Sequence, residues 1–461
     1  MLLKWKDRLM EEDLSQGNFG IEREGLRITP EGVLASTPHP EVFGNKLSNP
    51  SITTDFSESQ IEMITPVCQT VQQVYHSLSA LYRQTIVGLE KQEYLWPQSM
   101  PCVLAENQVV PVAHFGQGVE GQALTNYRQK LLEKYGPKKQ LISGIHYNFS
   151  FSESLLKKLY ESQASSMSYP VFKEQVYLKI VRQYLRYRWV LIYFLGASPV
   201  VDASYMSECD ESLMKIAQNS YAKQGAISFR NSSYGYQNQI PIYAQYQDVQ
   251  SYIHSLQTYI EEGQLLSVKE FYSPIRLKAK DSTCLMESLK KDGISYIEIR
   301  SIDLNPFEPL GISLADMQFI HLFILFLLDS EEVEAKDWQQ EAAYNEQRVA
   351  LNGRRPFLKI QKLGHEILMS DWAREILEKM QEINEAFSLD LEKVIRQKMD
   401  QLTDPQETIA GKIIELTKQS NYSELNLKLA KLHKENVLHR SFPNQMFKTL
   451  DLEGEDEVLS Q

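Results

Sequence analysis

The stretch Phe19-Gly-Ile-Glu-Arg-Glu-Gly-Leu-Arg-Ile28 decides the fold of this chain, because its pattern predicts a β-strand. A strand places every second side chain on the same face, so Glu22 and Glu24 should point the same way. Arg23 lies between them on the opposite face and is interpreted as a structural residue. Two neighbouring carboxylates repel each other, and burial adds to that penalty. The face is therefore either solvated or neutralised by a cation.

Three further segments show the same period-two alternation of polar and apolar residues. Their polar faces carry Glu58, Gln60 and Glu62 in residues 53–65, with Asp55 just before them; His146, Asn148 and Ser150 in residues 141–151; and Tyr296, Glu298 and Arg300 in residues 294–303. For a single strand, a solvated outer face is the ordinary explanation. Together the faces concentrate Glu, Asp, His and Asn with scarcely any Lys, which favours a shared divalent cation.

Hard cations such as Mg²⁺ prefer oxygen ligands and bind phosphates alongside carboxylates. Several acids on neighbouring strands could hold two or more such ions, and ATP would bring the matching anion. Arg230 and Arg300 carry guanidinium groups, which pair with a phosphate or a carboxylate through two hydrogen bonds. A structural ion pair remains the alternative for each arginine taken alone.

Composition and charge narrow the class of protein. The net charge of −12 argues against a nucleic-acid binder or a binder of anionic membranes. Residues 1–13 lack the apolar core of a signal peptide, and the longest apolar run, residues 319–328, is shorter than the roughly 20 residues that span a bilayer. The four cysteines are scattered, without a CxxC pair. We expect a cytoplasmic protein with reduced thiols and a buried helix at residues 319–328.

Composition also divides the chain into two parts. Residues 1–330 mix strand-like and helix-like segments and are expected to form a mixed α+β catalytic region, with strong helical periodicity over residues 173–195. Residues 331–461 are expected to form a helical region packed on it within one continuous domain, because no flexible linker intervenes. Helices are predicted there over residues 373–387, 391–402 and 408–418.

One familiar motif does not support a nucleotide site. Gly116-Gln-Gly118-Val-Glu-Gly121 matches the dinucleotide-binding pattern GxGxxG. Pro111 interrupts the strand that should precede the motif, and no acid lies about 20 residues beyond it. We therefore expect a loop, followed by a helix at residues 124–135. No P-loop signature occurs, so an ATP site in this chain must use a different architecture.

A series of longer motifs carries a resemblance to a known family. They are Phe19-Gly-Ile-Glu-Arg-Glu-Gly-Leu-Arg27, Ile52-Thr-Thr-Asp-Phe56 with Glu62-Met-Ile-Thr-Pro66, Tyr94-Leu-Trp-Pro97 with Met100-Pro-Cys102, Ile142-Ser-Gly-Ile-His-Tyr-Asn-Phe149, Tyr187-Arg-Trp189 with Gly196-Ala-Ser-Pro199, Phe271-Tyr-Ser-Pro-Ile-Arg276 and Tyr296-Ile-Glu-Ile-Arg-Ser-Ile-Asp-Leu-Asn-Pro-Phe307. In this order they resemble the bacterial glutamate–cysteine ligase (γ-glutamylcysteine synthetase) family, including the ligase half of the bifunctional glutathione synthetases.

The resemblance implies an α+β fold similar to glutamine synthetase, in which a mostly antiparallel sheet forms a funnel-shaped active site with helices packed outside. It implies a ligase that uses ATP to phosphorylate the γ-carboxylate of L-glutamate, so that the amine of L-cysteine attacks an acyl phosphate. The products would be γ-glutamylcysteine, ADP and phosphate, in the first step of glutathione biosynthesis. The implied cofactor is Mg²⁺, as two or more ions that Mn²⁺ could replace.

The resemblance also implies roles for individual residues. Metal ligands are expected at Glu22, Glu24, Asp55, Glu62, His146 and Glu298. Catalytic roles are expected for Arg230, Arg300 and Glu298, and nucleotide contacts for Arg276 and Arg300. The glutamate moiety is expected at Gln140, Ile142 and Ser143, and the cysteine side at Phe56, Tyr127, Leu131, Asn148, Tyr236 and Tyr272.

Two alternatives stay open at this point. One is the same ligase chemistry with a different amine acceptor, and the other is a metal-binding or nucleotide-binding regulatory protein without turnover. A glutathione synthetase domain or protein is the partner expected downstream, since the chain resembles one half of the bifunctional enzymes. Cys102 has no obvious partner over residues 151–199, so we expect no regulatory disulfide.

Overall fold

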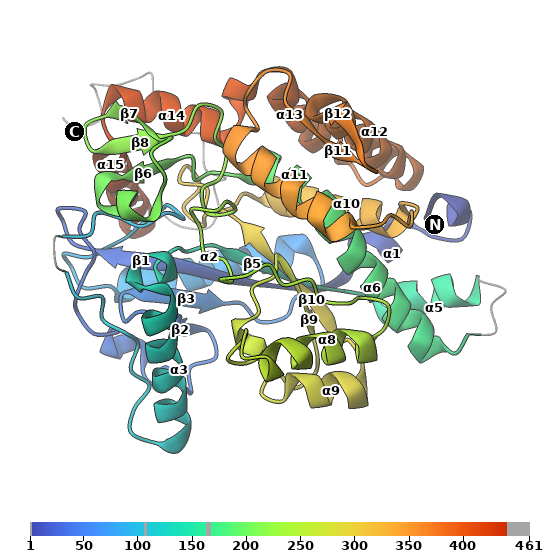
Figure 1. Cartoon of the computed structure of the whole chain (residues 1–461), viewed down its shortest axis with the longest axis horizontal. Helices are drawn as coiled ribbons and strands as arrows, with labels where there is room; N and C mark the ends of the chain where they lie inside the picture. The colour runs from blue at the N-terminus through green and yellow to red at the C-terminus, as the bar shows by residue number, and fades with distance from the viewer. Residues whose placement is uncertain (1, 106–107, 163–166, 440–461) are drawn as a thin grey trace.

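The stretch that carries Glu22 and Glu24 forms the long central strand β1 (Gly17–Ile28) of an antiparallel sheet (Figure 1). The computed structural model describes residues 2–105, 108–162 and 167–439. Within these residues the sheet has seven strands in the order β2-β3-β1-β5-β10-β9, and β4 pairs with β1. The other strands of this sheet are β2 (Ile52–Thr54), β3 (Gln60–Ile64), β4 (Tyr94–Leu95), β5 (Ile145–Phe151), β9 (Ile275–Lys278) and β10 (Tyr296–Ile302).

The strand register brings the predicted polar residues onto one face of the sheet. Glu24 lies opposite Glu62 of β3, and Glu22 lies opposite His146 of β5. On the next strand, Glu298 of β10 lies opposite Asn148 of β5. Four segments that are far apart in sequence therefore present polar side chains to the same side of the sheet, acids from three of them and His146 from β5.

One member of the predicted face lies elsewhere. Gln60 donates its backbone N–H to the carbonyl of Ser57, so residues 57–60 form a tight turn and β3 begins only at Gln60. Glu58 sits in this turn, where its carboxylate accepts the backbone N–H groups of His39 at 2.9 Å and of His114 at 2.7 Å. The prediction that Glu58 shares the polar face is wrong, because strand alternation does not continue through a turn.

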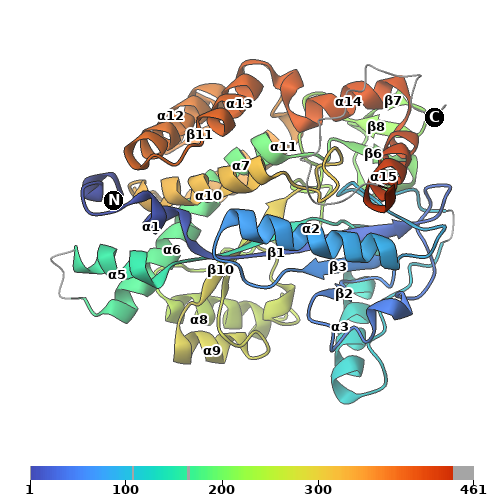
Figure 2. The ribbon, with the colours of Figure 1, turned by 180° about the vertical axis from the view of Figure 1, so that it is seen from behind.

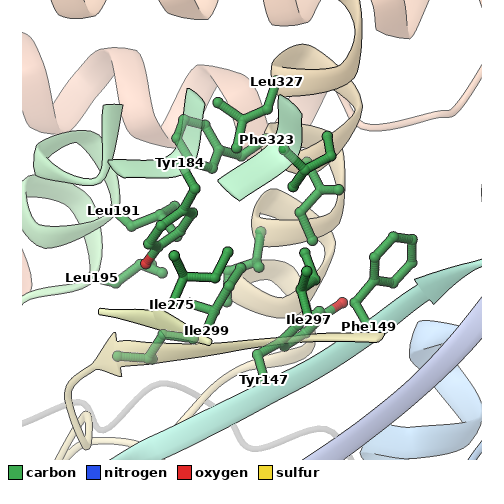
Figure 3. Close-up of a cluster of buried hydrophobic side chains, with 14 of the residues drawn as sticks. Tyr147, Phe149, Tyr184, Leu191, Leu195, Ile275, Ile297, Ile299, Phe323 and Leu327 are labelled. Atoms are coloured by element: carbon green, nitrogen blue, oxygen red, sulfur yellow. The ribbon is translucent and has the colours of Figure 1, made fainter. Parts of the chain in front are cut away.

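The opposite face of the sheet forms the main core. Arg23 points to this face, where its Nε donates to the carbonyl oxygen of Leu310 at 3.2 Å and its guanidinium lies over the ring of Tyr82. This confirms its structural role. Figure 3 shows the apolar cluster of this face, which includes Tyr147, Phe149, Ile275, Ile297 and Ile299 of the strands and Tyr184, Leu191, Leu195, Phe323 and Leu327 of the helices.

Helices cover this face of the sheet, and the segment predicted to be helical over residues 173–195 is divided between two of them. Residues 173–195 fall in two helices, α6 (Tyr169–Tyr187) and α7 (Trp189–Leu195), which meet at Arg188. The apolar run at residues 319–328 lies in α10 (Leu314–Asp329) and is buried, as predicted. Figure 2 shows α2 (Val71–Gly88) lying along β1 and β3. In the described part of the chain, no helix is both long and apolar enough to cross a membrane.

The helices predicted beyond residue 331 are present, and they pack on the rest of the molecule. Thr408 caps α14 by accepting the backbone N–H of Gly411 at its N-terminus. Contacts join α12 to α10, α11 to α6 and α7, and α15 to α2. Residues 440–461 of the predicted helical region lie outside the described residues. The three predicted helices are α12 (Met369–Phe387), α13 (Glu392–Thr403) and α14 (Ile409–Gln419), and this region also contains α11 (Trp338–Asn352) and α15 (Tyr422–His439).

The remaining elements are short or peripheral. The GxGxxG segment is a loop only as far as Gly118, because α3 (Val119–Tyr135) begins five residues before the predicted start and includes Gly121. Figure 1 shows α3 extending away from the sheet. The antiparallel α+β class is confirmed. The remaining helices are α1 (Glu11–Ser15), α4 (Pro137–Gln140), α5 (Glu153–Glu161), α8 (Val249–Glu261) and α9 (Leu285–Asp292). The remaining strands are β6 (Val200–Asp202), β7 (Met214–Ala217), β8 (Ser220–Ala222), β11 (Lys359–Lys362) and β12 (His365–Leu368).

Candidate active site

A cavity of about 880 Å³ opens on the polar face of the sheet, bounded by α3, by residues 267–272 and by the start of α9. Most of the residues with predicted roles line it. They are Glu22, Glu24, Asp55, Phe56, Glu62, Tyr127, Leu131, Gln140, Ile142, His146, Arg230, Tyr236, Tyr272, Arg276, Glu298 and Arg300. A volume of this size is within the range of small-molecule sites.

Three ligand-type side chains converge at the centre of the sheet. One oxygen each from Glu22 and Glu298 and one ring nitrogen of His146 all lie within 4.8 Å of one another. The Nδ1 atom of His146 is 2.8 Å from Oε2 of Glu22, and Asn148 donates its amide to Oε1 of Glu22 at 3.0 Å. Burial and the charge of Glu298 oppose ionisation of Glu22, but the contact with His146 lowers its pKa overall. The trio is arranged as one metal ion would require.

A second acidic group lies beside the first and shares His146 with it. Oε1 of Glu24 is 3.5 Å from Nε2 of His146, and its other oxygen accepts the backbone N–H of Gly144 at 2.9 Å. Burial, followed by the neighbouring Asp55, raises the pKa of Glu24. Burial and the carboxylates of Asp55, Glu22 and Glu24 raise the pKa of Glu62 well above its ordinary value. These acids repel one another, and no described cation neutralises Glu62 through an ion pair.

The donor set fits a divalent cation. Carboxylate oxygens and an imidazole are the ligands that Mg²⁺ and Mn²⁺ use in proteins. Oδ1 of Asn148 is buried without a hydrogen-bond partner among the described residues, which leaves a further oxygen near Glu22. A positive ion would remove the repulsion that raises the pKa of Glu24 and Glu62. The residues that could hold it are the five acids and the histidine predicted from the sequence, with Glu22, His146 and Glu298 the most closely placed.

Two cationic side chains, Arg300 and Lys278, contact the carboxylate of Glu298. Arg300 donates from Nη1 to Oε2 of Glu298 at 3.0 Å, and Nζ of Lys278 is 2.8 Å from Oε1 of the same carboxylate. Although burial opposes ionisation, these two charges hold the pKa of Glu298 well below its usual range. Nε of Arg300 and Nη1 of Arg230 are buried without a hydrogen-bond partner among the described residues. Both arginines therefore keep N–H groups free for an anion.

Arg230 reaches the site from a loop after β8, and a glycine makes room for it. Its Nη2 donates to the carbonyl oxygen of Arg300 at 2.6 Å, while Nη1 lies 3.9 Å from Oδ1 of Asp303. A Cβ atom at Gly144 would lie only 2.2 Å from Nη2 of Arg230. Glycine at this position therefore permits Arg230 to lie against the start of β5.

Three residues with predicted roles have other contacts. Ser143 does not line the cavity, since it is fully buried and its hydroxyl accepts from the amide of Gln60 at 3.1 Å. Asn148 lies behind Glu22 rather than in the lining. Arg276 lines the cavity, but its guanidinium donates to the carbonyl oxygens of Phe271 and Lys269. The binding roles of all three remain predictions.

The sequence did not predict four cationic residues that line the cavity, namely Arg128, Lys139, Lys269 and Lys278. Lys278 follows Arg276 by two positions in β9, so the same strand alternation that was applied elsewhere could have identified it. Arg128 lies on α3 beside Tyr127, donates to the carbonyl oxygen of Asp55 and has its guanidinium 4.3 Å from the centroid of the Phe115 ring. Its helical spacing of four residues from Leu124 was the available signal.

Comparisons with known proteins agree with this geometry. A family model described as glutamate-cysteine ligase matches residues 2–349. The chain is 38% identical over 460 residues to the glutathione biosynthesis bifunctional protein GshAB of Clostridium perfringens, covering 98% of this chain and 58% of that protein. It is 41% identical over 437 residues to the protein of the same name from Listeria welshimeri, covering 93% of this chain and 55% of the relative. The chain thus spans about half the length of these relatives.

Solved structures show the same fold. A crystal structure of glutamate–cysteine ligase from Francisella tularensis in complex with AMP has a TM-score of 0.86 and 29% identity, and covers 93% of this chain and 90% of that one. The bifunctional glutathione synthetase of Pasteurella multocida has a TM-score of 0.82 and 31% identity, and covers 95% of this chain and 55% of that one. Each likeness covers more than nine tenths of this chain.

Proposed function

This chain belongs to the glutamate–cysteine ligase family, and on that premise we propose that it joins the γ-carboxylate of L-glutamate to the amine of L-cysteine with conversion of ATP to ADP and phosphate. The product is γ-glutamylcysteine, the first intermediate of glutathione biosynthesis. The observation that carries the proposal is the placement of Glu22, His146 and Glu298 beside Arg230 and Arg300 in one cavity. Acids for metal ions and cations for anionic groups are both needed for this chemistry.

The main obstacle to the reaction is electrostatic, because glutamate and ATP are both anions. Mg²⁺ or Mn²⁺ held by the acids of β1, β3 and β10 and by His146 of β5 would supply Lewis-acid stabilisation of phosphate oxygens. The free N–H groups of Arg230 and Arg300 would donate to the anionic groups and orient them for in-line transfer. Glu298 holds Arg300 and Lys278 in place, so the positive side of the site is already assembled before substrates arrive.

The two amino acids are assigned to different lining residues of the cavity. Gln140 and Ile142 precede β5, where the carbonyl oxygen of Ile142 accepts from the amide of Gln60, and we assign the glutamate moiety there. The aromatic side chains Tyr127, Tyr236 and Tyr272 form an aromatic wall of the cavity, and we assign the acceptor amino acid to it. The amine must attack as a neutral group, and the enclosed acids would supply a base.

The nucleotide and the downstream step are also part of the proposal. The similarity to the AMP-bound ligase of Francisella tularensis supports ATP as the cosubstrate. The bifunctional names of the relatives support a fused glutathione synthetase activity as the consumer of the product.

The decisive experiment is a coupled assay of ADP release with glutamate, ATP and Mg²⁺, scanned over cysteine, 2-aminobutyrate and other amines. We expect release that depends on both amino acids, with cysteine preferred. Release with another amine but not with cysteine would identify a ligase with a different acceptor. Absence of release with every amine, from protein that still binds nucleotide, would contradict the proposal and indicate a regulatory protein.

A further inference from the structure

Glu270 is a fully buried carboxylate at the edge of the cavity, and neither the proposed metal sites nor the anion contacts use it. It ends a short 3₁₀ turn, residues Val268–Glu270, that leads into Tyr272 and β9. Its Oε1 accepts from Nζ of Lys134 at 2.5 Å and from the hydroxyl of Tyr135, and its Oε2 accepts the backbone N–H of Leu266 at 2.5 Å. A buried charge with this many partners is costly to disrupt, because each partner would lose its acceptor.

The partners of Glu270 belong to separate segments of the cavity wall. Lys134 and Tyr135 are the last residues of α3, the helix that carries Tyr127 and Leu131 on the cavity side. Leu266 and Glu270 itself belong to the segment that leads to Tyr272. Glu270 therefore joins the helical wall of the cavity to the wall formed before β9.

A third segment, which contains Tyr236 and Asn238, also contacts Glu270 and Tyr272. Asn238 donates its amide to the backbone carbonyl of Glu270 at 2.9 Å, and its Oδ1 accepts the backbone N–H of Tyr272 at 2.8 Å. Two residues earlier, Tyr236 packs its ring between those of Tyr135 and Tyr272, at centroid distances of 5.0 Å and 5.2 Å. The aromatic side chains of the wall thus lie in direct contact with the residues that Glu270 holds.

The helix α3 depends on such polar anchors because it buries little apolar surface. Of its 17 residues, all of which are described, Gly121 is the one that is buried. Figure 1 shows α3 extending away from the sheet, with few elements around it. Leu131 and Leu132 are only partly buried against the core, so α3 takes its position largely from a few specific contacts. At the C-terminal end of α3, Glu270 provides contacts to two successive residues, Lys134 and Tyr135.

We propose that Glu270 is a positioning residue that sets the selectivity of this site for its acceptor amino acid, by fixing Tyr127, Tyr236 and Tyr272 relative to one another. The inference rests on the proposed ligase function, and it adds the residue on which acceptor recognition depends. Glu270 acts through the aromatic wall rather than on the reacting atoms. Small displacements of such a wall weaken binding of the group that it contacts more than they change the chemistry elsewhere.

The test compares Glu270→Gln with Glu262→Gln, which removes the same charge from an exposed position at the end of α8. We expect Glu270→Gln to raise KM for cysteine by about tenfold or more, and to reduce the preference for cysteine over 2-aminobutyrate. KM for glutamate and for ATP should stay at the wild-type values, and Glu262→Gln should match wild type throughout. A uniform fall in kcat, or a lower melting temperature without a change in selectivity, would overturn the inference.

A second variant covers the case in which Glu270→Gln does not fold. Tyr135→Phe removes one hydrogen-bond donor to Glu270 and keeps the ring against Tyr236, so it should change KM for cysteine in the same direction by less. Unchanged selectivity in this variant would count against the inference.

Failure of the proposed function would be recognised separately, since wild-type protein would then release no ADP with any amine. Binding of 2-aminobutyrate, measured by calorimetry without turnover, would then decide the inference. The inference about Glu270 is overturned if wild type and Tyr135→Phe bind 2-aminobutyrate with the same dissociation constant.

Discussion

Glu22 and His146 face each other across β1 and β5, with Nδ1 of His146 2.8 Å from Oε2 of Glu22. The other ring nitrogen of His146 lies 3.5 Å from Oε1 of Glu24. One imidazole therefore connects the two acidic groups on the polar face of the sheet. This arrangement is unusual for a core histidine, because both ring nitrogens meet carboxylates instead of backbone carbonyl groups. It suggests that removing the ring should affect metal binding first.

His146→Ala should weaken binding of a divalent cation, because it removes one member of the closely placed trio with Glu22 and Glu298. We expect the dissociation constant for Mn²⁺, measured by electron paramagnetic resonance without substrates, to rise about tenfold or more. His321→Ala is a suitable control, since His321 is buried in the core and its Nε2 contacts the carbonyl oxygen of Leu14. That variant should lose stability instead. Unchanged metal affinity in His146→Ala together with a lower melting temperature would identify His146 as a core histidine.

Glu298→Gln should abolish glutamate-dependent ATP turnover while the protein remains folded. The substitution keeps the shape of the side chain but leaves Lys278 and Arg300 without their shared carboxylate. We expect kcat to fall by a factor on the order of 100 or more. The free energy of unfolding should fall by up to about 3 kcal/mol, because two partly buried cations lose their partner. Circular dichroism and a melting curve check the fold, and turnover close to wild type would remove Glu298 from the site.

Glu62→Gln should stabilise the metal-free protein at neutral and higher pH. Burial and the carboxylates of Asp55, Glu22 and Glu24 raise the pKa of Glu62 well above 4.5. A carboxyl group whose pKa is raised by folding binds more protons in the folded state than in the unfolded state. Its protonated form therefore contributes fully to the free energy of unfolding below about pH 4.5, and this contribution is lost as the pH rises through the folded-state pKa. The melting temperature of metal-free wild type should therefore fall from about pH 5 to pH 8, and Mg²⁺ should restore it.

The same substitution at Glu58 provides the control with the opposite sign. Hydrogen bonds from the backbone of His114 and from Lys46 outweigh burial and lower the pKa of Glu58. Glu58→Gln should therefore destabilise the protein at neutral pH. Glu62→Gln should instead raise the free energy of unfolding at pH 8 by about 1 kcal/mol or more, and Mg²⁺ should raise the melting temperature of this variant less than that of wild type. Melting temperatures with Mg²⁺ and with a chelator measure both effects. Equal destabilisation by the two variants would show that repulsion from the neighbouring carboxylates does not destabilise the ionised form of Glu62.

Gly144→Ala should reduce activity by displacing Arg230. A Cβ atom at this position would lie within 2.6 Å of three atoms of the guanidinium group, and the backbone N–H of Gly144 also donates to Glu24. We expect kcat to fall by a factor on the order of 10 to 100, with KM for glutamate raised. Gly118→Ala is the matched control, because nothing lies within 4 Å of its Cβ position and its φ of −66° suits alanine. Equal activity of the two variants would contradict the role of this close approach.

Much of the fold and of the candidate site could be predicted from local sequence pattern. The alternation of residues 19–28, 141–151 and 294–303 identified three strands and the face on which their acids lie. The opposite orientation of Arg23 and the burial of residues 319–328 followed from the same reasoning. These predictions succeeded because the direction of a side chain along a strand or helix depends on the backbone of that element alone.

The tertiary structure decided which of these faces meet and which side chains reach the cavity. Strand register placed Glu22 opposite His146 and Glu24 opposite Glu62, and a turn at residues 57–60 removed Glu58 from the face. Lys278 entered the site by its pairing with Glu298, and Glu270 acquired its partners from α3, more than 130 residues earlier in the chain. The physical reason is that register, loop course and contacts between distant segments depend on the packing of the whole molecule, which no local pattern encodes.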